Sequence, residues 1–229
     1  MKKLIILNLR FGLIRMSGNS KQRLSILGSG WLGFPLAEAL KLIGYDIFLS
    51  TTSEQRATEL SLYDFSVFIV NIDILEDTLQ PFLQSKILII NIPSKNINGY
   101  INLINIIEKS TIEKIIFISS TSVYLDQNKT IHEDDIDTVK GSDLFSIEQL
   151  FINNKNFQTT IVRFGGLIGY QRHPANFIKK QGLMLNPKGR INMIHRDDCI
   201  SIIQGIIDKN LWDEVFNAVA DEHPTREDF

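Results

Sequence analysis

The chain has 229 residues, of which 44% are hydrophobic, so it is long enough for one domain with a substantial core. Its net charge is −2 and it shows no basic patch, which argues against nucleic acid as a partner. The single cysteine, Cys199, excludes an internal disulfide and fits the reducing cytoplasm. Because Cys199 lies in an apolar helical pattern, we expect a buried side chain rather than a nucleophile.

Residues 1–20 precede the first regular element and are expected to form a poorly packed extension. Residues 1–14 loosely resemble a signal peptide, but Asn8 and Arg10 interrupt the apolar run and no small-residue cleavage site follows cleanly. The segment is also too short and interrupted to span a membrane, so no membrane association is expected. We interpret residues 1–15 as an extension, consistent with a start codon assigned too early.

Residues 23–33, R-L-S-I-L-G-S-G-W-L-G, are the most informative part of the chain. An apolar strand pattern precedes Gly28 and a helical pattern follows Gly33, so the glycines have G-x-G-x-x-G spacing in a strand–turn–helix. Gly28 permits the sharp turn, Gly30 lets the backbone approach a pyrophosphate, and Gly33 lets the helix pack close to the strand. The helix N-terminus adds free N–H groups and a partial positive charge. The motif predicts a dinucleotide site made by Gly28, Ser29, Gly30, Trp31, Leu32 and Gly33. A plain glycine-rich turn is the alternative.

The rest of the chain alternates between apolar strands and helical patterns. Strands are predicted at residues 45–50, 65–72, 86–92, 115–119 and 159–164, and helices at residues 54–60, 75–84, 97–109 and 143–153. Pro81 is unfavourable within the second of these helices. Because the strands are apolar without alternation, we expect them to be buried on both faces of a parallel sheet. The sequence therefore predicts an α/β, Rossmann-like doubly wound fold.

We expect residues 21–229 to form a single domain, in which residues 165–229 contribute the substrate side. Residues 169–190 contain Pro174 and Pro187 and are expected to be irregular, over the carboxyl edge of the sheet where ligands bind. Residues 215–229 predict a strand, a loop and the first turn of a helix.

The end of the second strand determines which dinucleotide is expected. An acidic residue there would favour NAD, but the chain has Thr51, Thr52 and Ser53. Together with the nearby Arg56, these hydroxyls suit a 2′-phosphate, so we expect NADP rather than NAD. The alternative, that these residues cap the next helix, is compatible with this role. At the end of the fourth strand, the adenosine half is expected to lie beside Ile92, Pro93 and Ser94.

The fifth strand ends in S-S-T-S-V-Y, residues 119–124. With G-S-G-W-L-G before it, this segment resembles the extended, or atypical, short-chain dehydrogenase/reductase family, relatives of the nucleotide-sugar epimerases and dehydratases. Later motifs agree in order: R-F-G-G-L-I-G, R-H-P, I-H-R-D-D and V-F-N-A, which begin at residues 163, 172, 194 and 215. The resemblance covers residues 24–229 and implies a Rossmann domain, a small C-terminal substrate region and NAD(P)-dependent redox chemistry. Since members of the family normally continue further, we expect a truncated chain or a reduced C-terminal region.

The resemblance places Ser120 at the family's catalytic serine, whose hydroxyl binds the substrate oxygen as hydride moves. The alternative is a strand end whose hydroxyls cap backbone groups. Tyr124 matches the tyrosine of the same motif, but Leu125 stands where the family has glycine. We therefore assign Tyr124 to the pocket wall more than to proton transfer.

The family's general acid, a Tyr-x-x-x-Lys pair, is missing from this sequence. The matching positions hold Lys140 and Leu144. A phenol with an ordinary pKa of about 10 needs a neighbouring cation to act near neutral pH. Two hypotheses remain: Tyr124 or a bound water transfers the proton, or the protein binds dinucleotide without turnover. The first is an oxidoreductase or epimerase-like enzyme acting on a small or sugar-like carbonyl or alcohol, and the second a regulatory or redox-sensing protein.

Further polar residues lie after the sixth strand. Arg172 suits recognition of a substrate phosphate or carboxylate, with an exposed loop arginine as the alternative. Arg163 is expected either to reach a substrate anion or to pair with an acid of the fold. We expect Asp198 to cap a helix and His195 to pack at the base of the pocket. No metal-site spacing is present. The expected partners are a small-molecule substrate and a second copy in a homodimer.

Overall fold

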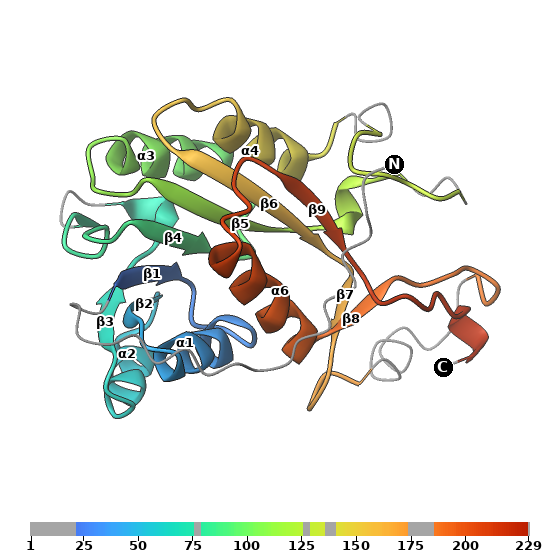
Figure 1. The fold of residues 1–229 in the computed structure, drawn as a ribbon, viewed down its shortest axis with the longest axis horizontal. Coiled ribbons are helices and arrows are strands. Elements are labelled where there is room, and N and C mark those ends of the chain that lie inside the picture. Colours follow the sequence, from blue (N-terminus) through green and yellow to red (C-terminus); the bar gives the residue numbers. More distant parts are fainter. Residues whose placement is uncertain (1–21, 76–78, 126–128, 136–140, 174–185, 229) are drawn as a thin grey trace.

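The computed structural model describes residues 22–75, 79–125, 129–135, 141–173 and 186–228. Its main element is a seven-stranded sheet in the order β3-β2-β1-β4-β5-β6-β9, in which every neighbouring pair is parallel (Figure 1). The strands are β1 (Arg23–Leu27), β2 (Asp46–Thr51), β3 (Ser66–Ile69), β4 (Ile87–Ile90), β5 (Lys114–Ser120), β6 (Gln158–Phe164) and β9 (Val215–Ala218). The predicted Rossmann-like fold is confirmed.

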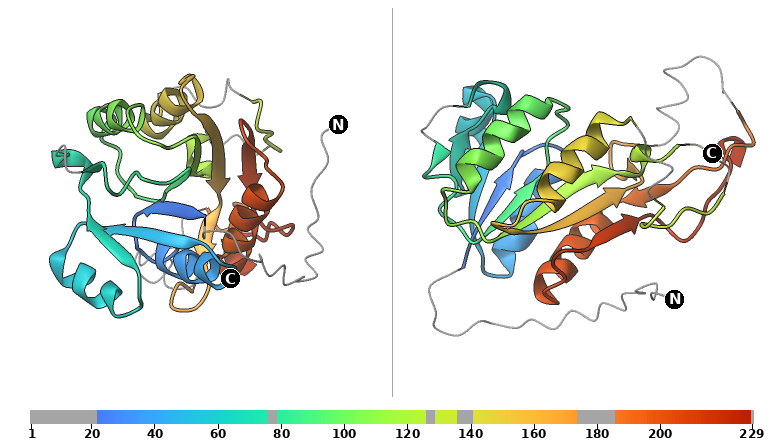
Figure 2. Two further views of the ribbon diagram at one scale, coloured as in Figure 1. Left: turned by 60° about the vertical axis from the view of Figure 1, so that its left-hand side comes forward. Right: turned by 90° about the horizontal axis from the view of Figure 1, so that it is seen from above.

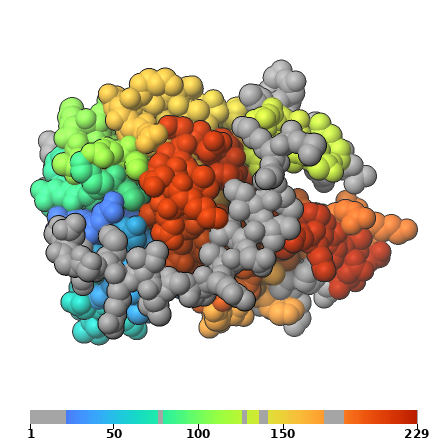
Figure 3. All heavy atoms as spheres, viewed as in Figure 1, coloured from blue at the N-terminus to red at the C-terminus, as the bar shows by residue number. Residues whose placement is uncertain are grey.

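Helices cover both faces of this sheet (Figure 2). They are α1 (Gly33–Leu42), α2 (Glu54–Ser61), α3 (Ile97–Ile107), α4 (Asp143–Ile152) and α6 (Arg196–Asp208). Residues of α1, α2 and α6 join one hydrophobic cluster, and residues of α3 and α4 join the other. In the space-filling view, the C-terminal part of the chain, drawn in red, covers the middle of one face (Figure 3).

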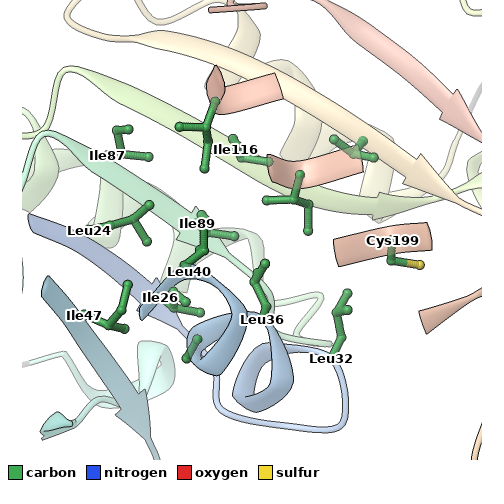
Figure 4. Close-up of a cluster of buried hydrophobic side chains, with 14 of the residues drawn as sticks. Leu24, Ile26, Leu32, Leu36, Leu40, Ile47, Ile87, Ile89, Ile116 and Cys199 are labelled. Atoms are coloured by element: carbon green, nitrogen blue, oxygen red, sulfur yellow. The ribbon is translucent and has the colours of Figure 1, made fainter. Parts of the chain in front are cut away.

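The central strands are buried on both sides, as their apolar runs predict, whereas the edge strand β3 leaves Ser66 and Ile69 exposed. Successive side chains of a strand point to opposite faces of the sheet. In β4, Ile87 and Ile89 therefore lie in the cluster with α1 and α6, whereas Leu88 and Ile90 lie in the other cluster. Cys199 is fully buried in the first cluster (Figure 4), so the expected buried thiol is confirmed.

Most predicted elements lie within two residues of their expected bounds, but two differ. The expected strand 65–72 is shorter, because β3 ends at Ile69 and a 3₁₀ turn follows at Ile72–Ile74. The helix expected at 75–84 is wrong: of its described residues, 75 is irregular and 79–84 form only short turns. Phe82 N–H donates to the Leu79 carbonyl in a 3₁₀-type bond, and Pro81 has no N–H to continue a helix.

The carboxyl end of β6 leads into a second, two-stranded parallel sheet of β7 (Gly166–Ile168) and β8 (Met193–His195). After β9 the chain passes through a loop to a 3₁₀ turn at Arg226–Asp228, as expected. The extension predicted for residues 1–20 lies outside the described residues, as does Lys140. None of the described helices is long and apolar enough to cross a bilayer.

Candidate nucleotide-binding site

The chain order of the sheet reverses at β1 and β4, which pair directly although β2 and β3 follow β1 in sequence. In an open α/β sheet the crevice at the carboxyl ends of such strands is the usual ligand site. The glycine loop of residues 28–33 lies at this point, between the end of β1 and the start of α1. The sheet topology therefore places the predicted motif at the switch point.

The loop has the geometry of an anion-binding turn. Gly28 has a φ of +105°, and its N–H donates to Ser50 Oγ at 3.0 Å, which ties the loop to the end of β2. No side chain caps the N-terminus of α1 at Leu32, and the first turn carries no acidic residue. By contrast, Ser53 caps α2 and Asn96 caps α3. The start of α1 therefore keeps the N–H groups and positive dipole that favour a phosphate.

Each glycine of the motif plays a different part. A Cβ at Gly28 would lie 2.4 Å from the Asn91 carbonyl oxygen, and one at Gly33 would lie 1.9 Å from the Gly28 carbonyl oxygen. These two positions are closed by protein backbone. A Cβ at Gly30 would have nothing within 4 Å, and Gly30 is exposed. The loop is therefore packed at its ends and open at its centre, which is the arrangement that the dinucleotide motif requires. Of the remaining predicted loop residues, Ser29 and Leu32 are buried and Trp31 is partly buried.

The end of β2 presents fewer free hydroxyls than the sequence suggests. Ser53 caps α2 by accepting the Arg56 N–H at 3.3 Å, so the capping alternative is confirmed for this residue. Thr51 is buried, whereas Thr52 is exposed. The Arg56 guanidinium forms an exposed ion pair with Glu59 at 2.9 Å.

The end of β4 adjoins the same crevice. The Asn91 N–H donates to the Leu27 carbonyl at 2.8 Å, and the Asn91 side chain lies near Gly33. Ile92 is partly buried and Pro93 is exposed. Ile92 also approaches Gly28, where an added Cβ would lie 2.8 Å from its side chain. Ile92 therefore borders the loop, while the adenosine contact of Ile92 and Pro93 remains a prediction.

Ser120 ends β5 and caps a short 3₁₀ turn, Thr121–Val123. Its Oγ accepts the Ser122 N–H at 3.1 Å, so the capping alternative is confirmed. A hydroxyl that accepts a bond still has its own proton to donate. None of the described residues accepts that proton from Ser120. The neighbouring Ser119 differs, because its hydroxyl donates to the buried carboxylate of Glu148 at 2.5 Å.

Tyr124 is held in a polar network. Its hydroxyl donates to Asn217 Oδ1 at 2.8 Å and accepts from Arg163 Nη1 at 2.6 Å. Burial raises the pKa of the Tyr124 phenol above its ordinary value, although the charge of Arg163 and the hydrogen bond that Arg163 donates oppose this shift. The phenol therefore favours its neutral form, and its hydroxyl is engaged in hydrogen bonds with Asn217 and Arg163.

Arg163 pairs with an acid of the fold, which was one of the two alternatives. Its Nη2 lies 2.6 Å from Glu148 Oε2, and both side chains are almost fully buried. Burial alone would lower the pKa of Arg163, but the hydrogen bonds and charge of Glu148 outweigh it and raise that pKa. The guanidinium is thus a structural partner of α4. Leu144, which takes the position of the family lysine, is partly buried on the same helix.

The loop after β7 reaches the glycine loop. Residues 169–172 form a tight hairpin in which Gly169 and Arg172 exchange backbone hydrogen bonds of 3.1 and 3.0 Å. The Arg172 guanidinium lies 4.5 Å from the centroid of the Trp31 ring. Arg172 is exposed, as the loop alternative expects, but it also lies beside Trp31 of the glycine loop.

The cap of α6 is a correction to the sequence analysis. Asp198 does not cap this helix: His195 is the N-cap residue, and its Nδ1 accepts the Asp197 N–H at 3.3 Å. Asp198 lies in the first turn, where an acidic side chain complements the helix dipole. The His195 ring packs tightly against Gly169, where an added Cβ would lie 2.4 Å from Nε2. This supports a packing role for His195.

Sequence reasoning missed three contributors. Glu148 and Asn217 carry the network around Tyr124, and Arg196 lies 5.2 Å from the Trp31 ring centroid. The signal for Glu148 was available, because a glutamate on the apolar face of a predicted helix requires a buried partner. Arg196 had no signal, since its neighbour Trp31 lies far away in the sequence. Among the described residues, no group of His, Cys, Asp or Glu could hold a metal ion.

Comparisons with known proteins agree with this fold. No family model matches the chain. Protein YeeZ of Escherichia coli (strain K12) is 27% identical over 223 residues, covering 91% of this chain and 81% of YeeZ. Among solved structures, two are similar to this chain. One is a Methylobacillus flagellatus protein provisionally assigned as an NAD-dependent epimerase/dehydratase, and the other is UDP-glucuronic acid 4-epimerase from Bacillus cereus in complex with NAD.

The first structure has a TM-score of 0.74 at 19% identity and covers 91% of this chain and 79% of its own. The second has a TM-score of 0.71 at 18% identity and covers 90% of this chain and 80% of its own. Similarity at such low identity is evidence about the fold. The resemblance to the extended short-chain dehydrogenase/reductase family is therefore confirmed at that level.

Proposed function

We propose that the chain binds a nicotinamide dinucleotide at the glycine loop and acts as an NAD(P)-dependent oxidoreductase or epimerase-like enzyme. The single observation that carries the proposal is the loop at the switch point, which is closed by backbone at Gly28 and Gly33 and open at Gly30. The NAD complex of a structurally similar epimerase supports it. The substrate class is a small or sugar-like carbonyl or alcohol.

In this proposal, different residues bind the dinucleotide, orient the substrate and bind its charged group. Backbone N–H groups of residues 30–33 and the uncapped start of α1 would hold the pyrophosphate. The nicotinamide ring, when bound, supplies or accepts a hydride. Ser120 Oγ, fixed by the Ser122 N–H, directs a free hydroxyl proton to a substrate oxygen and stabilises developing charge there. Arg172 binds an anionic group of the substrate.

NADP is the dinucleotide we propose. Thr52 is exposed at the end of β2, and the Arg56–Glu59 pair is partly exposed. Such a surface pair is weak, so Arg56 can exchange its carboxylate partner for a 2′-phosphate. The expected result is tighter binding of NADPH than of NADH, with the difference lost in Arg56→Gln and retained in Lys155→Gln. Equal affinity for both coenzymes in the wild-type chain would contradict NADP.

A dinucleotide-binding regulatory protein is the second candidate. The hydrogen-bonded state of Tyr124 and the leucine at position 144 favour it, because neither provides a proton donor with a lowered pKa. Titration calorimetry with NADH and NADPH tests binding, and a panel of sugar nucleotides and simple carbonyls tests turnover. Turnover that disappears in Ser120→Ala supports the enzyme, and tight binding without turnover supports the sensor. No heat of binding with either coenzyme at millimolar concentration would refute both.

A homodimer in the cytoplasm is also proposed. The outer face of α3 and α4 carries Ile101, which is 38% exposed, beside Asn105, Ser146 and Gln149. The whole of α3 lacks charged residues. An isologous contact places a patch against its own copy, and uncharged amides avoid like-charge repulsion there. Light scattering is expected to give twice the chain mass, and Ile101→Lys to give the monomer. A monomeric wild-type chain would contradict the dimer.

A further inference from the structure

Two arginines gather around the tryptophan of the glycine loop. The Cζ of Arg172 lies 4.5 Å from the Trp31 ring centroid, and that of Arg196 lies 5.2 Å from it. Arg196 also lies 3.8 Å from the centroid of the Tyr170 ring. Because Trp31 directly follows Gly30, the stack connects the open centre of the loop to the 169–172 hairpin and to the start of α6.

The charges of this stack are unbalanced. Both guanidiniums carry a positive charge, and neither forms an ion pair with a described carboxylate. The nearby Asp197 carboxylate instead accepts from the Tyr170 hydroxyl at 3.0 and 3.1 Å. Two like charges beside one ring repel each other unless an anion lies between or beside them. The stack therefore lacks a negative partner within the described part of the chain.

Two hydrogen-bond donors in the stack are also unsatisfied, although Arg196 Nη1 donates to the Trp31 carbonyl at 3.5 Å. Arg196 Nε and Trp31 Nε1 are shielded from solvent, and neither has a partner among the described groups. A buried donor without an acceptor costs free energy, so such groups indicate a missing partner. Arg196 is moreover the first residue of α6, where a positive charge opposes the helix dipole. Its position is thus unfavourable for stability, which points to a binding role.

We propose that Arg172 and Arg196 form a second phosphate subsite beside the glycine loop. This inference rests on the proposed function and extends it to the ligand's charged groups. Planar guanidiniums bind phosphate oxygens through paired N–H donors, and Trp31 holds both of them in place. The phosphate comes either from the dinucleotide's pyrophosphate or from a phosphorylated substrate, and the two sources are separable by experiment.

Trp31 itself provides the readout. The chain has two tryptophans, and Trp212→Phe leaves Trp31 as the single tryptophan, which is excited selectively at wavelengths that tyrosine does not absorb. In this background, inorganic pyrophosphate, NADPH, UDP and adenosine are titrated while Trp31 emission is recorded. Pyrophosphate is expected to change the emission, because it moves the guanidiniums on the ring, whereas adenosine, which lacks phosphate, leaves the stack unchanged.

Arg172→Gln and Arg196→Gln are each expected to weaken pyrophosphate binding by at least about tenfold, the loss expected for a charged hydrogen bond. Arg190→Gln is the matched control, because this substitution removes the same charge from an arginine that donates to the His223 carbonyl. A parallel loss for NADPH alone identifies the cofactor as the phosphate source, and a loss for UDP alone identifies the substrate.

Equal pyrophosphate affinity in Arg172→Gln, Arg196→Gln and Arg190→Gln overturns the subsite, as does a wild-type chain that does not bind pyrophosphate. If a glutamine variant does not fold, Arg196→Lys and Arg172→Lys decide, because lysine keeps the charge but loses the paired donors: intermediate weakening supports the subsite and unchanged affinity overturns it. Pyrophosphate binding without NADPH or NADH binding refutes the proposed function but leaves the subsite supported.

Discussion

Alanine at Gly30 and alanine at Gly33 are expected to have opposite effects. At Gly33 a Cβ would lie 1.9 Å from the Gly28 carbonyl oxygen and 2.8 Å from Asn91 Nδ2. Backbone must move to accept it, so Gly33→Ala should lose about 1–3 kcal/mol of stability, the usual cost of overpacking. At Gly30 nothing lies within 4 Å and φ is not positive, so the fold accepts the methyl group. Gly30→Ala should even gain about 0.4–1 kcal/mol, because the unfolded chain loses freedom.

Coenzyme binding is expected to depend most on Gly30, the position whose substitution the fold accepts. The open space at Gly30 is where the pyrophosphate would pass, so Gly30→Ala should abolish calorimetric binding of NADPH and NADH while the melting temperature stays unchanged or rises. Gly33→Ala should lower the melting temperature by about 2–4 °C for each kcal/mol lost. Gly44→Ala is the control, because Gly44 has open space but a φ of +109° away from the loop. A stable Gly30→Ala variant that binds coenzyme as tightly as the wild-type chain would refute the reasoning.

Three other predictions concern the core and the reaction. Glu148→Ala should lose about 3–5 kcal/mol in urea denaturation, because it leaves the buried Arg163 charge unpaired; a loss below 1 kcal/mol would contradict this. Burial raises the pKa of the Cys199 thiol from 9.0 to about 12, so the unfolded chain ionises first. The stability from this group is intact below about pH 9 and falls between pH 9 and 12. The free energy of unfolding should therefore decrease more steeply with pH in the wild-type chain than in Cys199→Ala over this range. Parallel pH profiles of the two chains would exclude this contribution. Ser120→Ala should reduce turnover with unchanged coenzyme affinity, whereas Ser122→Ala should change neither; equal turnover in both variants would remove Ser120 from the reaction.

The fold was largely predictable because it depends on local patterns. Apolar runs without alternation indicated strands buried on both faces, and the burial of Ile87 and Leu88 on opposite sides of β4 confirms this. The error at residues 75–84 arose because helical periodicity outweighed Pro81. Its described residues 79–84 form short turns instead, and the apolar side chains Phe82 and Leu83 are buried without a helix.

The site was predictable in part, for a similar reason. The glycine loop is contiguous in sequence, so its spacing indicated its geometry. The network of Tyr124 and the stack on Trp31 join side chains far apart in the chain, such as Tyr124 with Asn217 and Trp31 with Arg196. No local pattern encodes such pairs. The prediction of the α6 cap was wrong for a different reason. Asp198 is a good capping residue by type, but His195 occupies the cap position and its ring nitrogen accepts the Asp197 N–H.

The surroundings of Tyr124 and Ser120 favour Ser120 as the hydrogen-bond donor to a substrate. A proton donor that works near neutral pH needs a lowered pKa, and burial raises that of Tyr124. Its hydroxyl proton is already directed to Asn217, and its oxygen already accepts from Arg163. Ser120 has the opposite arrangement, because its oxygen is fixed by Ser122 N–H while its proton has no described acceptor. In the proposed enzyme, the Ser120 hydroxyl stabilises developing charge through a hydrogen bond, and water completes the proton transfer. Under the proposed function, enzyme and sensor would therefore differ in whether water reaches the substrate oxygen assigned to Ser120, and not in how the dinucleotide would be held.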